Sequence, residues 1–504
     1  MQVNWKLVVP TAVFAVCEAP TFVSYASYTF GWDDAEYLWR SMAASNAFWF
    51  GHRHDLINAI GSHGPIMSLL GLPWGPLHSW DGAGECFLTH AALTGFFVAL
   101  CLFLLLRVSL KPQYLVVASA CVFAALGPYL TATTVRVDAA GFATDSLFAW
   151  IVFAAVLLIP YEATTRNSSD ADAIVRGFLW GIIFSVGLLT KVSSLFFVGL
   201  VVPVVLVIRL RNSGLRAALV SLTSLAVCSS FVAAYWFLYG RTAWDYGWSS
   251  SFGPIAKLYA VPLPDFLGIT LRESPGMLLP VLFVMAAVTY SIIRWREIEW
   301  KTNLLPILIM TAYCMICLAS RNREIRFSFP GIIALPFLFA ILVSGKTPSF
   351  PSRTTAIAAI FVFFYQVVAA VPTLHRPNRK SIALSEAILA QAYESNAKDI
   401  LLATDSSSLN YSLMRLAIAV SPSRSTFHTA NLAWRAADGS PMEKDFRDIR
   451  QADLVVFQNK EDLDSPITNM RLSEYEQFAL QYFGEVPLSE VDGVRIYGAR
   501  SKQH

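Results

Sequence analysis

Residues 31–37 read Gly31-Trp32-Asp33-Asp34-Ala35-Glu36-Tyr37 and follow directly on an apolar run, 7–30, in which Glu18 is the only charged residue. An apolar run of this length predicts a helix that crosses a bilayer. Three carboxylates within four positions therefore stand where a first transmembrane helix leaves the membrane. Charged groups at that boundary are costly to maintain, which makes them candidates for a functional role.

The composition extends this interpretation to most of the chain. The 504 residues are 55% hydrophobic and 14% charged, with a mean hydropathy of +0.51, which is typical of a polytopic membrane protein. A net charge of only +3 gives no reason to expect a nucleic-acid partner. We predict a mainly α fold, a bundle of about 11 transmembrane helices, from apolar stretches at 7–30, 87–106, 114–130, 142–160, 177–190, 192–208, 217–239, 276–293, 304–320, 327–344 and 354–372.

Charge bias between loops predicts the orientation of this bundle. Lys and Arg concentrate in alternate loops, those that hold Arg107/Lys111, Arg166/Arg176, Arg209/Arg211/Arg216, Arg294/Arg296/Lys301 and Lys346/Arg353. Because such loops stay in the cytoplasm, the N-terminus is predicted to be cytoplasmic and the acidic stretch extracytoplasmic. Two predicted outer loops, 31–85 and 240–275, are long and rich in aromatic residues, which suits a position at the headgroup level among membrane lipids.

The character of the chain changes after residue 373. Residues 374–504 hold 15 of the 38 Lys/Arg and 17 of the 35 Asp/Glu and no spanning run, so they are predicted to face water. Strands are expected at 400–404, 452–457 and 494–497, and a helix at 409–420. We therefore divide the chain into a transmembrane domain, 1–373, and a small α/β domain, 374–504, on the extracytoplasmic side.

The acids admit two interpretations. Asp33, Asp34 and Glu36 can form a solvated patch at a helix exit, or one of them can serve as a general base for a hydroxyl acceptor. Asp145 precedes an unbroken apolar run, so it is either the N-cap of the fourth helix or a second acid of the same site, and both roles can hold at once.

Four cations stand on the predicted outer side, against the charge bias of the other loops. Lys191 separates two apolar runs, and Arg321, Arg323 and Arg326 share one short loop. They can pair with acids such as Glu324 or snorkel to the interface. They can also form an anion site, because guanidinium forks and an ammonium suit a lipid phosphate at this depth.

Histidines of the first outer loop raise the question of a metal. His52, His54, Asp55 and His63 could together bind a divalent ion. His-x-His spacing on a loop is weakly specific, so no metal ligand and no cofactor are assigned, and a divalent metal is left open.

The order of several short motifs resembles that of the C-type glycosyltransferase (GT-C) superfamily, in particular the branch of the protein O-mannosyltransferases and the lipid A aminoarabinose transferase. The resemblance covers about residues 7–345 and rests on Asp33-Asp34-Ala35-Glu36-Tyr37, His63-Gly64-Pro65, Thr144-Asp145-Ser146-Leu147, Leu189-Thr190-Lys191 and Arg326-Phe-Ser-Phe-Pro330. It implies a GT-C-like fold and transfer of a sugar from a polyprenyl-phosphate donor to a hydroxyl, with inversion at the anomeric carbon. The acceptor class stays open among lipid A or its core, polysaccharide, glycolipid and protein.

Site residues carry over by position. The resemblance implies that Asp33 is the essential acid of the first loop, supported by Asp34, that Asp145 is the second acid, and that Lys191 and Arg326 contact the donor phosphate. Further phosphate contacts are predicted at Arg321 and Arg323, and substrate contacts at His63, Glu36 and Tyr37. The branch often has Asp-Glu where this chain has Asp33-Asp34, which leaves the two acids' roles interchangeable.

The predicted location is the inner membrane of a bacterium, with the endoplasmic reticulum as the alternative. Two other function classes stay open: a transporter or flippase of a phosphate-bearing lipid or sugar, which would need polar groups near mid-bilayer, and a non-enzymatic binding scaffold that uses residues 374–504.

Overall fold

The computed structural model describes residues 32–61, 64–108, 144–164, 169–253, 260–273, 303–323, 329–344, 379–404, 408–421, 427–432, 442–459, 472–484 and 486–498, with a few isolated residues between them. The chain divides into two compact units. The first consists of Met1–Ser24, Gly61–Met67 and Thr89–His375, and the second of Tyr25–Ile60, Ser68–Leu88 and Arg376–His504.

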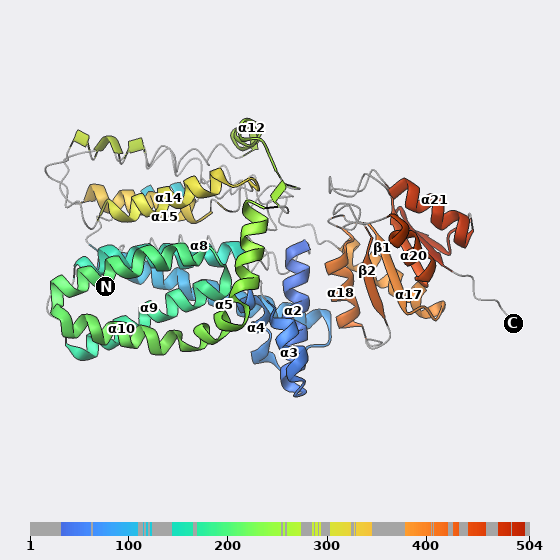
Figure 1. The fold of residues 1–504 in the computed structure, drawn as a ribbon, viewed down its shortest axis with the longest axis horizontal. Coiled ribbons are helices and arrows are strands. Elements are labelled where there is room, and N and C mark those ends of the chain that lie inside the picture. Colours follow the sequence, from blue (N-terminus) through green and yellow to red (C-terminus); the bar gives the residue numbers. More distant parts are fainter. Residues whose placement is uncertain are drawn as a thin grey trace, which may run out of the picture. The chain divides into compact units, whose positions relative to one another are not determined.

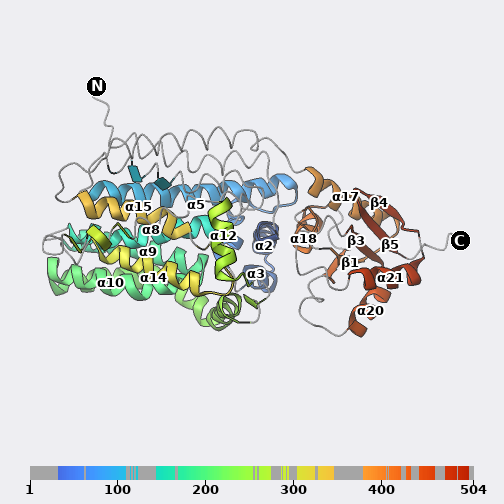
Figure 2. The same ribbon diagram turned by 90° about the horizontal axis from the view of Figure 1, so that it is seen from above.

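The first unit is a bundle of long apolar helices (Figures 1 and 2). Its described helices are α5 (Trp80–Arg107), which begins in the second unit, α8 (Thr144–Ala163), α9 (Asp170–Thr190), α10 (Ser194–Ser251), α12 (Leu263–Glu273), α14 (Leu305–Ala319) and α15 (Phe329–Ser344). Among the described residues, α8, α9 and α10 are long and apolar enough to cross a membrane. The apolar helices thus support an integral membrane location.

Helix α8 is the centre of this bundle. Its residues 147–159 are all at most 3% exposed, and α9, α10, α14 and α15 all pack against it. A helix that is apolar on every side belongs in the interior of a bundle, which explains why α8 shows no amphipathic face.

Helices α8 and α9 form an antiparallel hairpin with an ion pair at each end. At one end Asp145 pairs with Lys191, and at the other Glu162 pairs with Arg176 at 3.2 Å. The 21 residues of α9 make it about 31 Å long, close to the thickness of a hydrocarbon core. The charges therefore flank an apolar layer of bilayer depth and fix the register of the two helices.

Two glycines bring α9 and α10 into close contact. A Cβ atom at Gly177 would stand 2.2 Å from the carbonyl oxygen of Ser221, and one at Gly181 would stand 2.5 Å from Cβ of Cys228. Glycines four residues apart on one helix face allow such an approach, which is a common device for helix packing in membranes.

Helix α10 is bent at Gly214, whose φ of 84° and ψ of 173° lie outside the helical region. The part after the bend, residues 215–251, is roughly 55 Å long at the usual helical rise. This is longer than a hydrocarbon core of about 30 Å. This part of α10 is therefore long enough to extend beyond the apolar layer.

The described part of the second unit begins with short helices from the first predicted outer loop. These are α2 (Trp32–Trp49), α3 (Arg53–Ile60), η1 (Leu72–Trp74) and the first turns of α5, with α4 (Pro65–Leu69) at the boundary between the units. Asn46 fastens α2 to the following segment, because its side chain accepts from the backbone N–H of Leu77 at 2.7 Å and donates to the Leu77 carbonyl at 2.9 Å.

The remainder of the second unit is an α/β domain. Five strands, β1 (Asp399–Ala403), β2 (His428–Asn431), β3 (Leu454–Gln458), β4 (Ser489–Val491) and β5 (Val494–Gly498), form a sheet in the order β2-β1-β3-β5-β4. Strands β1, β2 and β3 are parallel, whereas β5 runs antiparallel to β3 and β4.

Alternation along the strands decides which helices cover each face of this sheet. Ile400 and Leu402 face a cluster that includes residues of α17 (Arg379–Glu394) and α18 (Tyr411–Val420). Leu401 and Ala403 face a cluster with α20 (Met442–Gln451) and α21 (Leu472–Phe483). This is the expected result of a two-residue side-chain period in a sheet buried on both sides.

The predicted fold class, a helical membrane bundle followed by a small α/β domain, is confirmed. Helices α8, α9, α14 and α15 match the apolar stretches 142–160, 177–190, 304–320 and 327–344, and α10 joins 192–208 to 217–239 through its bend. The stretches 7–30 and 354–372 lie outside the described residues.

One difference concerns the predicted outer loop 240–275. It is largely helical, because α10 continues to Ser251 and α12 begins at Leu263. Hydropathy marks where a helix leaves the apolar layer and not where its hydrogen bonding ends, so the aromatic turns after residue 239 were assigned to a loop.

Candidate functional site

The junction between α9 and α10 holds the best-placed candidate residue. Helix α9 ends at Thr190, and Lys191 adopts an extended backbone with φ −154° and ψ 137°. The backbone N–H of Lys191 still donates to the carbonyl of Gly187 at 2.9 Å. A cation directly after a helix C-terminus is favoured by the helix dipole.

Asp145, in the first turn of α8, is the partner of this lysine. Lys191 Nζ donates to Asp145 Oδ1, and the two side chains are only 16% and 6% exposed. The structure therefore brings together two residues 46 positions apart in the sequence, one predicted as an acid of the site and the other as its cation.

Two aromatic rings complete the surroundings of the ammonium. Lys191 Nζ lies 4.5 Å from the ring centre of Phe327 and 5.7 Å from that of Phe148. Both distances are within the range of a cation–π interaction. One carboxylate and two ring faces thus hold the charge at a fixed place.

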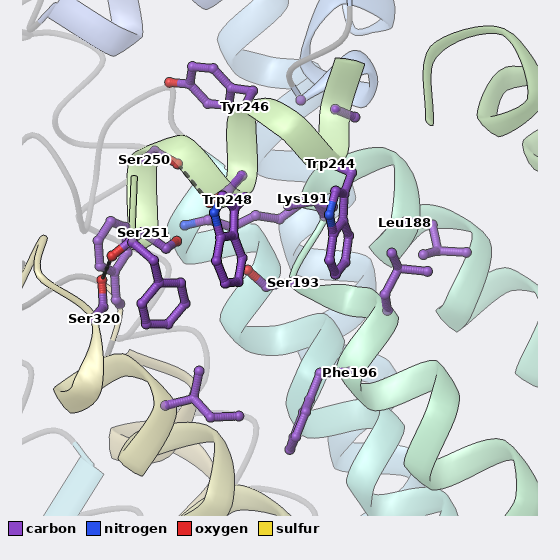
Figure 3. Close-up of a pocket in the computed structure, with 18 of the residues that line it drawn as sticks. Leu188, Lys191, Ser193, Phe196, Trp244, Tyr246, Trp248, Ser250, Ser251 and Ser320 are labelled. Carbon is purple, nitrogen blue, oxygen red and sulfur yellow. Dashed lines mark hydrogen bonds between the residues drawn. The ribbon is translucent and has the colours of Figure 1, made fainter. Parts of the chain in front are cut away.

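Lys191 is also part of the wall of a cavity of about 510 Å³. Its walls come from the α9–α10 junction, the last turns of α10, the end of α14 and the segment after it (Figure 3). The lining residues are Gly64, Pro65, Leu188, Lys191, Val192, Ser193, Leu195, Phe196, Tyr235, Trp236, Ala243, Trp244, Tyr246, Gly247, Trp248, Ser250, Ser251, Phe252, Tyr313, Ile316, Cys317, Ser320 and Phe327.

The cavity wall consists mainly of aromatic and other apolar side chains, with one charged side chain. Of the described residues that line the cavity, Lys191 is the only one that carries a formal charge. Hydroxyl groups supply further polarity; Ser320 Oγ donates to the Ser251 carbonyl at 2.7 Å and so ties the segment after α14 to the end of α10 (Figure 3). An apolar cavity with a few polar groups is the usual form of a small-molecule site.

The acids of the first outer loop lie in the second unit. Asp33 and Asp34 are in the first turn of α2, and their side chains lie outside the described part of the chain. Glu36 accepts from Arg40 at 2.8 Å and from Arg415 at 3.1 Å. Tyr37 is buried at 3% exposure, so two of the predicted substrate contacts are engaged within the protein.

The arginines after α14 differ from one another. Arg323 donates to the carbonyls of Leu318 at 2.9 Å and Val261 at 2.5 Å, which fixes the segment that follows α14. Arg321 is exposed. Arg326, like His63, lies outside the described residues, so the structure leaves the predicted roles of these four residues as predictions.

A metal site is not formed by the described side chains. His52 and His54 approach Asp55 at 3.5 Å and 3.8 Å, and all three are exposed. In the described part of the chain, no group of three His, Cys, Asp or Glu side chains has the arrangement to hold an ion.

The sequence analysis did not identify most of the residues that line the cavity as site residues. Trp244, Tyr246 and Trp248 were expected as interfacial rings and are found on the wall, whereas Tyr313 and Ser320 were not singled out. They come from helix ends that meet only in three dimensions, so spacing along the chain could not identify them.

Comparison with known proteins identifies the fold. No protein-family model matches the chain, and no curated protein matches its sequence. Among solved structures, it is similar to the crystal structure of ArnT from Cupriavidus metallidurans bound to undecaprenyl phosphate, with a TM-score of 0.58 and 13% sequence identity over 99% of each chain. The chain has the fold of ArnT.

The resemblance inferred from the motifs is thus confirmed at the level of the fold. The similarity extends over both units, because it covers 99% of this chain and includes the α/β domain. At 13% identity, the similarity to ArnT concerns architecture and carries no residue roles.

Proposed function

We propose that the chain is an integral membrane glycosyltransferase that moves a sugar from a polyprenyl-phosphate donor to a hydroxyl acceptor on the extracytoplasmic face. One observation carries the proposal: the ammonium of Lys191, held by Asp145 and two aromatic rings, stands at the wall of a cavity of about 510 Å³. The structurally similar ArnT was crystallised with undecaprenyl phosphate, and a single fixed cation in an aromatic cavity suits such a lipid phosphate.

The aromatic wall is suited to the apolar part of such a donor. Trp244 and Trp248 line the cavity on the last turns of α10, and Trp236 lines it from earlier on the same helix. We place the last turns at the boundary of the apolar layer. Tryptophan is favoured at this boundary because its ring is apolar and its N–H is polar. An isoprenoid phosphate has the same division, with its charged head at the interface and its chain in the bilayer.

The reaction then follows from the placement of charge. The acceptor oxygen attacks the anomeric carbon, the bond from that carbon to the phosphate oxygen breaks, and its electron pair leaves with the phosphate. A carboxylate takes the proton of the acceptor hydroxyl, and Lys191 stabilises the charge that develops on the phosphate. On the family pattern we assign the base to Asp33, with Asp34 and Asp145 as supporting acids, and inversion at the anomeric carbon.

The same pattern supports further donor contacts at Arg321, Arg323 and Arg326, and a substrate contact at His63. We propose the bacterial inner membrane as the location, with a cytoplasmic N-terminus and an extracytoplasmic α/β domain. The acceptor class comprises lipid A or its core, polysaccharide, glycolipid and protein.

The test is a transfer assay with purified protein. It is incubated with radiolabelled hexoses and pentoses linked to undecaprenyl phosphate, with lipid A and envelope protein as acceptors. We expect one donor to release undecaprenyl phosphate while label moves to an acceptor, and Asp33→Asn to abolish this transfer in a protein that still folds in the membrane. Label that crosses proteoliposomes without a covalent product would favour a flippase and contradict the proposal.

A further inference from the structure

The α/β domain contacts α2, the helix that carries the acidic stretch. Helix α2 packs against α18 within the second unit. Arg415 Nη1 of α18 donates to both carboxylate oxygens of Glu36, at 3.3 Å and 3.1 Å, and Ser412 Oγ donates to the same carboxylate at 3.4 Å. Residues almost 380 positions apart are thus joined through one side chain.

Aromatic rings hold the arginine of this contact. The Arg415 guanidinium carbon lies 3.3 Å from the ring centre of Trp39 on α2 and 5.3 Å from that of Tyr411 on α18. Arg40, one turn after Glu36, donates to the same carboxylate at 2.8 Å. An arginine stacked on a ring and paired with a carboxylate is more rigid than an exposed ion pair, since its planar fork is held in two directions.

Helix α2 also carries a buried apolar face. Ala35, Leu38 and Met42 are spaced three and four residues apart on α2, and none has exposed surface. This spacing places them on one helix face. The ion pair between Glu36 and Arg415 therefore lies on α2 next to a buried apolar face.

A second link joins the same domain to the other end of the first outer segment. Trp80, the first residue of α5, donates through Nε1 to Glu386 of α17 at 3.2 Å, and its ring packs against the core shared by α17 and α18. The domain thus holds both the entry and the exit of the segment between α2 and α5.

We propose that the α/β domain is a positioning element for the acids of α2, with Arg415 as the positioning residue. Residues 33 and 34 lie in the first turn of α2, directly before Ala35 and Glu36. Because Glu36 is fixed to α18, the orientation of the first turn of α2 relative to α18 is fixed as well. This inference rests on the proposed function, since it assigns the domain a task in the same reaction.

The test compares Arg415→Gln with a matched control, Arg450→Gln, in the full-length protein. Arg450 is an exposed arginine of the same domain that lies 5.0 Å from the ring of Phe478 and within α20. For Arg415→Gln we expect kcat to fall about 10- to 100-fold, because small displacements of a catalytic group have effects of this size. The KM for the lipid donor is expected to stay within about twofold, because Lys191 belongs to the other unit. The control is expected to keep both constants.

Hydrogen exchange supplies a readout that is independent of activity. Amides of residues 32–40 are expected to exchange faster in Arg415→Gln than in the wild type or the control. If Arg415→Gln does not reach the membrane, Arg415→Lys keeps the charge and removes the planar fork, and the same changes are expected in weaker form.

The outcomes separate the two proposals. A wild type that transfers sugar, together with an Arg415→Gln variant of unchanged kcat or a variant whose KM rises instead, overturns the positioning role alone. A wild type that transfers no sugar overturns the proposed function and the positioning role with it. Unchanged exchange of residues 32–40 shows that Arg415 does not order α2 and also overturns the inference.

Discussion

Replacing Lys191 with methionine tests the proposed phosphate contact. Methionine keeps most of the apolar stem and removes the ammonium, which lies between Asp145 and the rings of Phe148 and Phe327. The side chain is 16% exposed, so its interaction with a phosphate is only partly screened by water. A hydrogen bond to a charged group contributes about 1.5–3 kcal/mol.

This energy sets the size of the expected effect. At 1.4 kcal/mol for each factor of ten, Lys191→Met should weaken the binding of undecaprenyl phosphate about 10- to 150-fold. Binding is measured by titrating the lipid phosphate into detergent-solubilised protein and following tryptophan fluorescence, because Trp236, Trp244 and Trp248 line the cavity. Lys257→Met is the control, since this lysine is exposed and is not part of the wall.

A double variant separates a lost phosphate contact from a simple loss of charge balance. Lys191→Met alone removes the ammonium that pairs with the Asp145 carboxylate, which is 6% exposed, and removing one partner of a buried charge is itself unfavourable. Lys191→Met combined with Asp145→Asn removes both charges. If the double variant binds undecaprenyl phosphate as tightly as the wild type, the ammonium does not contact the phosphate and the reasoning is refuted.

Three further predictions follow from other contacts. Asp145→Asn should bind undecaprenyl phosphate more tightly than the wild type, because its carboxylate no longer neutralises the lysine, and should turn over more slowly; the same titration and the transfer assay measure both. Gly177→Ala should lower the free energy of unfolding by about 1–3 kcal/mol, because its Cβ would stand 2.2 Å from a backbone oxygen of α10. The control Gly199→Ala should be neutral or stabilising, because its Cβ meets nothing within 4 Å. Unfolding in detergent compares the two variants. Glu162→Gln should lower that free energy by about 1–3 kcal/mol, because Arg209, 1% exposed, loses one of its two carboxylate partners and keeps Asp172 at 3.2 Å. An unfolding midpoint close to that of the wild type would contradict this.

The elements with a strong hydrophobic pattern could be predicted from the sequence. Residues 144–160 of the apolar run 142–160 and the strand 454–458 are largely buried in their respective units, so pattern and burial agree. The break at Lys191 was also predictable, because a charged residue between two apolar runs indicates the end of a membrane-spanning helix.

Spatial partners could not be predicted, because hydropathy does not encode which ends meet. The charge pattern predicts Arg176 and Arg209 in inner loops, whereas both lie in helices and pair with Glu162. Glu36 was a candidate for substrate binding, and its link to Arg415 depends on a contact across almost 380 residues. In each case the partner is set by packing of apolar faces elsewhere in the chain.

The two ends of the α8–α9 hairpin differ in a way that argues for a function at one of them. At the Glu162 end, Arg176 and Arg209 lie on the carboxylate, Trp180 donates to it at 3.3 Å, and no residue of this group lines the cavity. At the Lys191 end, the ammonium pairs with the Asp145 carboxylate, and the lysine lines a cavity of about 510 Å³. Both ends fix the same helix pair, so stability alone accounts for a charge at each. Stability does not account for the position of Lys191 on a cavity wall. A buried cluster such as the one around Glu162 would hold the hairpin equally well, and it would avoid the unfavourable free energy of a cavity. The position of Lys191 on a cavity wall therefore supports our proposal that an anionic ligand binds at this end of the hairpin.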